Sequence, residues 1–117
     1  MDLDSAFQKH GLWIEEFCNA IFNQNSLDAL AYEKDNHCEL GMWLYGEGKK
    51  KYGKLNSYSC LVSKHATFHE AAGKIVQAIN AGEYISAEVM LGEEGDYAAA
   101  SRAVHLAIKQ LKEESQS

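Results

Sequence analysis

The chain of 117 residues contains no proline. Proline removes a backbone donor and clashes with the preceding turn, so its absence leaves long helices uninterrupted. The sequence also has no apolar run of about 18 residues, the length at which a transmembrane helix becomes a candidate, and no signal-peptide pattern. We therefore expect a cytoplasmic protein without membrane insertion.

Positive charge is scarce. The chain has 11 Lys and Arg against 17 Asp and Glu, which gives a net charge of -6 and a pI near 5.3. Nucleic acids and anionic membrane surfaces bind proteins that present a basic footprint. The composition therefore argues against both as partners.

Cysteine is also scarce, and the three cysteines, Cys18, Cys38 and Cys60, cannot pair completely within the chain. An odd number of thiols without an export signal indicates a reducing compartment, where a metal-bound thiolate is an ordinary role for one of them. At 13.0 kDa the chain is long enough to bury a core without disulfides. We expect a single domain, residues 1–117, with Cys18 as a small core residue.

Apolar residues recur at intervals of three and four along most of the chain, which predicts an all-α fold. The pattern predicts long helices over residues 3–22, 55–80 and 83–112. Gly82 is expected to end the second of these, and the glycines at 92 and 95 to bend the third. The predicted core-facing positions include Phe17, Leu61, Phe68, Ile85, Val89 and Val104.

A short helix is predicted from the Asp35-Asn36 pair to Tyr45. Glu39 follows Asn36 by three residues, as in a capping box, and Gly46 ends the pattern. Cys38 is then expected in the first turn, where backbone N–H groups and the helix dipole would favour its thiolate. Residues 27–34 are predicted to form a linker with weak helical character, and residues 49–54 a basic loop.

Four residues form a candidate metal site. His65 and His69 are four residues apart on a predicted helix, so their side chains lie on one face and can reach one ion. Such pairs also occur by chance, but His10 lies among core-facing aromatic residues and Cys38 supplies a thiol. One cysteine and three histidines make a complete tetrahedral set. We expect Gly41 to permit a close helix contact and Trp43 to line the site, while His37 and His105 are expected at the surface.

The spacing of these residues resembles a known family. The pattern is His10-x-x-Trp13, then 24 residues, Cys38-x-Leu40-Gly41-x-Trp43, then 21 residues, and His65-x-x-x-His69. It is similar to the chemoreceptor zinc-binding (CZB) domain of bacteria. The resemblance implies a four-helix bundle, with an additional short helix carrying the cysteine, that holds one zinc ion through His10, Cys38, His65 and His69.

The resemblance also implies a regulatory role in chemotaxis and related signal transduction. Such domains are usually fused to chemoreceptors or to diguanylate cyclases, which are commonly dimeric. Metal occupancy, or redox sensing through oxidation of the zinc-bound cysteine, alters the output of these proteins. No methyl-accepting coiled coil and no cyclase motif is attached here. We therefore expect a partner in trans, or in cis within a larger protein, and a possible homodimer.

The alternative from a different class is a metalloenzyme or a di-iron helical bundle. A di-iron site needs carboxylates one turn from its histidines. The residues one turn after His10, His37, His69 and His105 are Ile14, Gly41, Gly73 and Lys109. No HExxH general base is present either, because Ala66 follows His65. We therefore assign no catalytic residue and expect no enzymatic activity.

Overall fold

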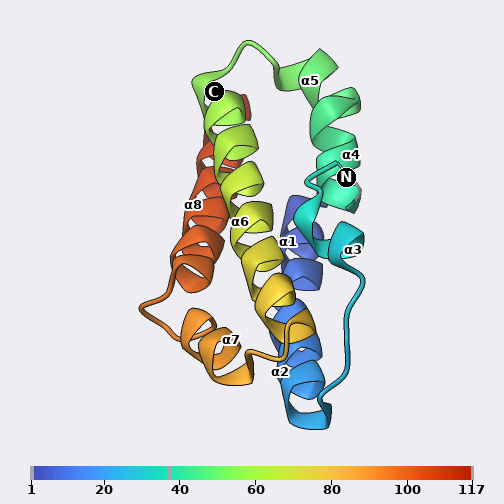
Figure 1. Ribbon diagram of the computed structural model, residues 1–117. Coiled ribbons are helices and arrows are strands. Elements are labelled where there is room, and N and C mark those ends of the chain that lie inside the picture. Colours follow the sequence, from blue (N-terminus) through green and yellow to red (C-terminus); the bar gives the residue numbers. More distant parts are fainter. Residues whose placement is uncertain (1, 37, 117) are drawn as a thin grey trace.

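The computed structural model describes residues 2–36 and 38–116, and its regular elements in this part of the chain are all α-helices (Figure 1). These helices are α1 (Leu3–Gly11), α2 (Trp13–Asn23), α3 (Ala29–Glu33), α4 (Glu39–Tyr45), α5 (Glu47–Tyr52), α6 (Asn56–Asn80), α7 (Tyr84–Met90) and α8 (Asp96–Ser115). The predicted all-α bundle is confirmed. No described helix has both the length and the apolar character needed to cross a membrane.

The 25-residue helix α6 is the centre of the bundle, and α8 packs along it (Figure 1). The buried residues of α6 recur at helical spacing, as the sequence predicted. The buried apolar side chains of α6 include Leu61, Phe68, Ile75, Val76 and Ile79. They share one core with the buried α8 side chains Tyr97, Val104, Ile108 and Leu111. Beyond α6, Gly82 has a φ of +78°, so the predicted glycine end of this helix is confirmed.

The N-terminal segment is broken where a single helix was predicted. The hydrogen-bonding pattern changes at Leu12, whose N–H bonds to the carbonyl of Lys9, three residues back. Gly11, directly before the break, weakens a helix interior through its backbone entropy. The two halves then pack on different partners, α1 on α4 and α8, and α2 on α6 and α7.

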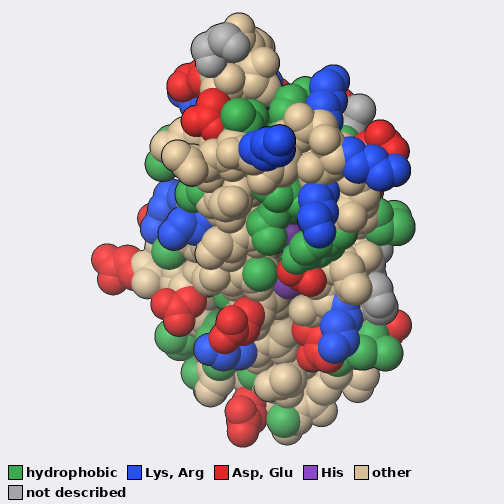
Figure 2. Space-filling view, turned by 90° about the horizontal axis from the view of Figure 1, so that it is seen from above, with side chains coloured by type: hydrophobic (Ala, Val, Ile, Leu, Met, Phe, Trp, Pro, Cys, Tyr) green, Lys and Arg blue, Asp and Glu red, His purple; other side chains and the backbone are tan. Residues whose placement is uncertain are grey.

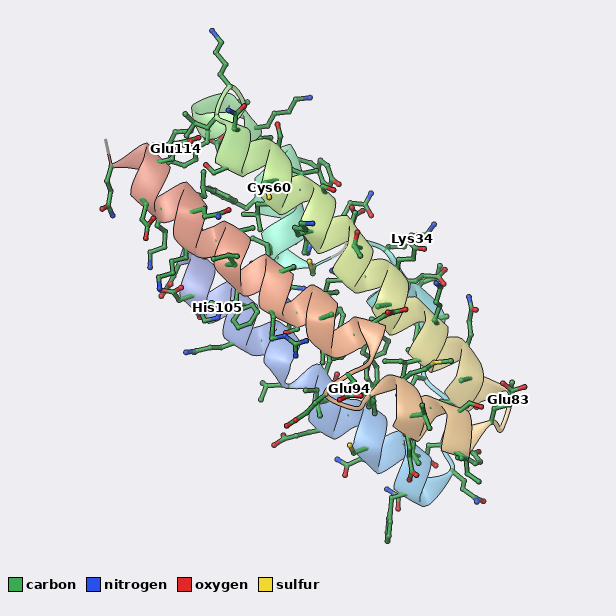
Figure 3. All side chains as sticks on the ribbon, turned by 90° about the vertical axis from the view of Figure 1, so that its left-hand side faces the viewer. Lys34, Cys60, Glu83, Glu94, His105 and Glu114 are labelled. Atoms are coloured by element: carbon green, nitrogen blue, oxygen red, sulfur yellow. The ribbon has the colours of Figure 1, made fainter. Side chains whose placement is uncertain are left out.

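The C-terminal segment is two helices, not one bent helix. A turn containing Gly92 and Gly95 separates α7 from α8. Ile85 and Val89 were predicted to face the core but are 79% and 71% exposed. Figure 3 shows Glu83 and Glu94 at either end of α7, with a turn between α7 and α8. The apolar register does not continue across this turn, and α7 instead buries Ala87.

The linker predicted to have weak helical character and the predicted basic loop both contain a short helix. The linker contains α3, whose first turn is capped by the Asp28 side chain, which accepts a hydrogen bond from the N–H of Leu30. The basic loop contains α5, where Gly48 allows the Trp43 ring to lie against the backbone. Three consecutive lysines can occupy a helix when it lies at the surface, because their side chains remain in water.

Two of the predictions about single residues have different outcomes. Cys18 is exposed on α2, so its placement in the core was wrong, because the buried stripe of α2 passes through Phe17 and Ala20 instead. His105 is exposed as predicted and stacks on Phe7, with ring centroids 4.7 Å apart. His37 lies outside the described residues.

Gln24 ends α2 in a left-handed conformation, with a φ of +56°. A residue with a Cβ is strained there, whereas glycine is not. We predict that Gln24→Gly raises the free energy of unfolding by about 0.5–1 kcal/mol, measured by urea denaturation. The matched control is Gln77→Gly on the exposed face of α6, which should lower stability by about 1 kcal/mol because glycine is a poor helix residue. A loss of stability in both variants would contradict the assigned strain.

Candidate metal centre

Four side chains from three parts of the fold converge in the bundle. His10 comes from α1, Cys38 immediately precedes α4, and His65 and His69 project from α6. One potential ligand atom from each residue lies within 4.8 Å of all the others. His65 and His69 are fully buried and His10 nearly so, and little histidine surface reaches the face shown in Figure 2. The structure therefore brings together all four residues singled out from the sequence.

The distances between these atoms fit a tetrahedral ion. The Nε2 atom of His69 lies 3.0 Å from that of His65 and 3.3 Å from that of His10. The Sγ atom of Cys38 lies 3.3 Å and 3.4 Å from the Nε2 atoms of His65 and His69. Ordinary zinc bond lengths would give edges of about 3.3 Å between nitrogens and about 3.6 Å between nitrogen and sulfur in a regular tetrahedron. These four separations are within a few tenths of an ångström of that size, and the remaining two, from His10 to His65 and to Cys38, are within 4.8 Å.

Two of the histidines have their protonation pattern fixed by backbone carbonyls. The Nδ1–H of His10 donates to the carbonyl of Ala6 at 3.0 Å, and the Nδ1–H of His69 donates to the carbonyl of Tyr32 at 2.7 Å. A carbonyl only accepts, so in the neutral rings both Nε2 atoms carry lone pairs. Two lone pairs 3.3 Å apart form no hydrogen bond. A shared cation between them satisfies both atoms.

His65 differs from the other two histidines because no backbone carbonyl fixes its protonation. Its Nδ1 is buried without a hydrogen-bond partner. If its Nε2 carried the proton, it would satisfy His69 or Cys38 but would still leave the lone pair of His10 unpaired. A cation coordinated by all three Nε2 atoms leaves one proton on each Nδ1, as metal-bound imidazole requires. The donor set therefore fits a metal ion better than a network of hydrogen bonds alone.

Burial keeps the histidines in the form that binds metal. It lowers the pKa of His65 to about 3, with smaller contributions in the same direction from His69 and His10. It also lowers the pKa of His69 to about 4, although the hydrogen bond to Tyr32 acts in the opposite direction. The pKa of His10 is lowered by burial as well. All three rings are neutral at pH 7, so their lone pairs are available to a ligand ion.

Cys38 is the N-cap of α4, whereas the sequence placed it in the first turn behind an Asp35-Asn36 cap. Its Sγ accepts a hydrogen bond from the N–H of Gly41 at 3.2 Å. Burial nevertheless raises the pKa of the thiol, and the backbone N–H groups offset this only in part. The helix terminus alone therefore does not produce the expected thiolate. A bound divalent cation is the charge that deprotonates a coordinating thiol.

Close packing holds this cysteine in place. A Cβ on Gly41 would lie 1.6 Å from the carbonyl oxygen of Asp35, so only glycine fits. The close contact predicted for Gly41 is present, but with the backbone of residues 35–36 and not with a helix. The prediction for Trp43 was wrong, because its ring packs on α5 beside Tyr52, with centroids 6.0 Å apart.

Trp13 lines the centre instead. Its ring centroid lies 4.9 Å from that of His10 and 5.2 Å from that of His69, and Phe68 stacks on it. This aromatic wall reduces the access of water to the histidines. The sequence contained a signal for it, since Trp13 follows His10 by three residues and so lies on the same side of the N-terminal segment.

The carbonyls of Ala6 and Tyr32 were not predicted. Every residue has a backbone carbonyl, so residue types alone do not show which of them a histidine will meet. Ala6 precedes His10 by one helical turn, whereas Tyr32 lies in a segment to which the sequence assigned no role. Partners of this kind fix the tautomer and orientation of metal-binding histidines.

The chemistry of the cluster is that of a closed site. Four protein donors satisfy a tetrahedral ion and leave no position for water or substrate. Among the described residues, the cluster contains no carboxylate. A di-iron centre requires bridging carboxylates, so this arrangement does not meet its chemical needs.

Comparison with known proteins agrees with this geometry. The family model for the chemoreceptor zinc-binding domain matches residues 10–76, more than half of the 117-residue chain. The matched range begins at His10 and includes Cys38, His65 and His69. No curated protein and no solved structure matches the chain. The family match shows that this chain belongs to the chemoreceptor zinc-binding (CZB) domain family.

Proposed function

We propose that the chain is a non-enzymatic regulatory module that binds one Zn²⁺ through His10, Cys38, His65 and His69. The observation that carries this proposal is the convergence of three imidazole Nε2 atoms and one sulfur in a buried position, all within 4.8 Å of one another and four of the six pairs at 3.0–3.4 Å. Nitrogen and thiolate donors in a tetrahedral set are the preference of zinc. The family description supports the same metal.

The proposed output is a change in a signalling partner such as a chemoreceptor or a diguanylate cyclase, in cis or in trans. This partner, a cytoplasmic location and a possible homodimer rest on the family resemblance and on composition. Within the domain, zinc occupancy ties α1, α4 and α6 together. Loss of the ion therefore removes a link between three helices. These helices are then less restrained relative to one another.

Oxidation of Cys38 is the proposed second input. The sulfur attacks an oxygen of hydrogen peroxide, the O–O bond breaks, hydroxide leaves and the sulfur becomes a sulfenic acid. The oxidised sulfur is a poorer zinc ligand, whereas the histidines are unchanged. The short helix α4, which begins directly after Cys38, is then free to move.

The proposed ligand set predicts the metal content of single variants. Protein purified without added metal should contain one zinc per chain by elemental analysis. His65→Ala removes a ligand and should lower zinc affinity by at least about a hundredfold, since loss of even an outer-shell partner costs about 10–100-fold. The control His105→Ala removes an exposed histidine outside the cluster and should retain one zinc. Iron equal to or exceeding zinc in the wild type would contradict the proposal.

Metal removal should destabilise the bundle. If free zinc exceeds its dissociation constant a thousandfold, binding adds about 4 kcal/mol to the free energy of unfolding. For a domain of this size that corresponds to roughly 10–20 °C in melting temperature. Thermal melts followed by circular dichroism, with zinc and with strong chelator, measure the shift. An unchanged melting temperature after confirmed metal loss would count against a role of zinc in the fold.

Oxidation should release zinc through Cys38 alone. The experiment uses zinc-loaded wild type and the Cys18→Ser, Cys60→Ser double variant, which removes the other two thiols. Peroxide or hypochlorous acid is added in stoichiometric amounts, and a chromophoric chelator reports released zinc. We expect equal release from both proteins, in proportion to Cys38 oxidation measured by mass spectrometry. Zinc that stays bound to a chain with oxidised Cys38 would disprove the redox input.

A further inference from the structure

A strap, residues 27–36, connects the far end of α6 to the metal centre (Figure 1). At its start, both backbone groups of Leu27 bond to the side chain of Asn80. The N–H donates to Oδ1 at 2.8 Å, and the carbonyl accepts from Nδ2 at 2.9 Å. At its other end, the backbone of Asp35 packs against Gly41. The strap thus spans from the last residue of α6 to the residues just before Cys38.

In its middle, the strap lies unusually close to α6. A Cβ added to Gly73 would be 2.8 Å from the Cβ of Glu33, nearer than side chains normally approach. Gly73 is one helical turn beyond His69. The glycine therefore allows α3 to sit directly over the turn of α6 that carries this ligand.

Tyr32 makes the contact with the metal centre. Its carbonyl accepts the hydrogen bond from Nδ1 of His69 at 2.7 Å. Its side chain faces α2, where the hydroxyl donates to Oε2 of Glu16 at 3.1 Å and the ring meets Trp13 edge-on at 4.9 Å. Trp13 itself lies against His10 and His69. The strap is thus connected to the centre through both its backbone and its one large aromatic ring.

The strap lies along α6 but buries little apolar surface there. None of the residues of α3 is buried, so little apolar surface holds this helix in place. Leu27 and Tyr32 are only partly buried. Segments with few buried apolar contacts open at low cost in free energy. The hydrogen bonds of Leu27 and Tyr32 therefore provide a large share of what keeps the strap on α6.

We propose that the strap is a positioning element for His69 and that its docking on α6 is coupled to metal occupancy. This rests on the proposed zinc binding. The Tyr32 carbonyl holds the proton on Nδ1 and so keeps the Nε2 lone pair directed at the centre. A cation on Nε2 makes Nδ1–H a stronger donor, which strengthens the bond to Tyr32. By linkage, whatever loosens the strap weakens metal binding, and metal loss loosens the strap.

The test compares two variants that loosen the strap with a matched control. Asn80→Ala removes both bonds to Leu27, and Gly73→Ala forces α3 away from α6. Asn56→Ala is the control, because Asn56 is exposed at the opposite end of the same helix and forms no side-chain hydrogen bond with the described residues. Zinc affinity is measured by competition with a chromophoric chelator, and folding is checked by circular dichroism.

We expect a loss of zinc affinity of about three- to tenfold in Asn80→Ala and about 10–100-fold in Gly73→Ala, with wild-type affinity in Asn56→Ala. The melting temperature of Asn80→Ala should fall further with zinc than without it, whereas a merely structural anchor would lower both equally. If Gly73→Ala does not fold, the zinc affinity of Asn80→Ala alone tests the coupling. Equal zinc affinity in Asn80→Ala and Asn56→Ala would overturn the coupling while leaving zinc binding intact, and a wild type that binds no zinc would overturn both.

Hydrogen exchange gives the reciprocal readout on the unmodified chain. Removing zinc should speed exchange of strap amides, including the N–H of Leu27, by about tenfold or more relative to amides in the middle of α8, if the coupling matches a typical linkage between two sites. Unchanged exchange in the strap after confirmed zinc loss would overturn the proposal.

Discussion

The structure depends on how three neutral imidazoles and one thiol can share a single buried position. Polar groups taken from water need partners, and each unpaired one costs about 1–3 kcal/mol. Here the nitrogen lone pairs face one another at 3.0–3.3 Å, and their opposite ring nitrogens are turned to carbonyls or, in His65, left unpaired. No rearrangement of protons satisfies every atom. A cation bound by the three Nε2 atoms and the sulfur would pair all four ligand atoms and leave only Nδ1 of His65 without a partner, and it would thereby convert an unfavourable cluster into a cross-link.

The short helix α4 is one of the elements that the proposed cross-link would tie to the bundle. The helix has seven residues, and its buried apolar side chains are Leu40 and Leu44. The Tyr58 hydroxyl donates to the carbonyl of Leu44, and an exposed ion pair joins Lys9 to Glu39. Exposed ion pairs contribute about 0–1 kcal/mol. Under the proposed zinc binding, coordination through Cys38 would add a further link between α4 and the rest of the bundle.

Two glycines allow another segment to lie where their own side chains would ordinarily be. Gly41 admits the carbonyl of Asp35 and Gly73 admits the side chain of Glu33, so the strap contacts α4 and α6 at short range. The first contact sets the position of the chain leading into Cys38, and the second sets the distance of Tyr32 from His69. The positions of Cys38 and His69 thus depend on the strap as well as on the helices α4 and α6.

The sequence by itself determined the helical class, the buried face of α6 and all four residues of the cluster. It could do so because helical periodicity and the four-residue spacing of His65 and His69 are local properties, repeated along one element. The resemblance to the family added the longer gaps to His10 and Cys38. These predictions needed no knowledge of how separate elements meet.

Tertiary structure decided the rest. It broke the N-terminal helix near Leu12 so that its halves pack on different partners, and it left Ile85 and Val89 at the surface because a turn separates α7 from α8 and interrupts the apolar register. It made Trp13, and not Trp43, the aromatic wall of the centre. It also selected the carbonyl of Tyr32 as the partner of His69. A backbone carbonyl is the same in every residue, so only the meeting of distant segments determines which one a ligand uses.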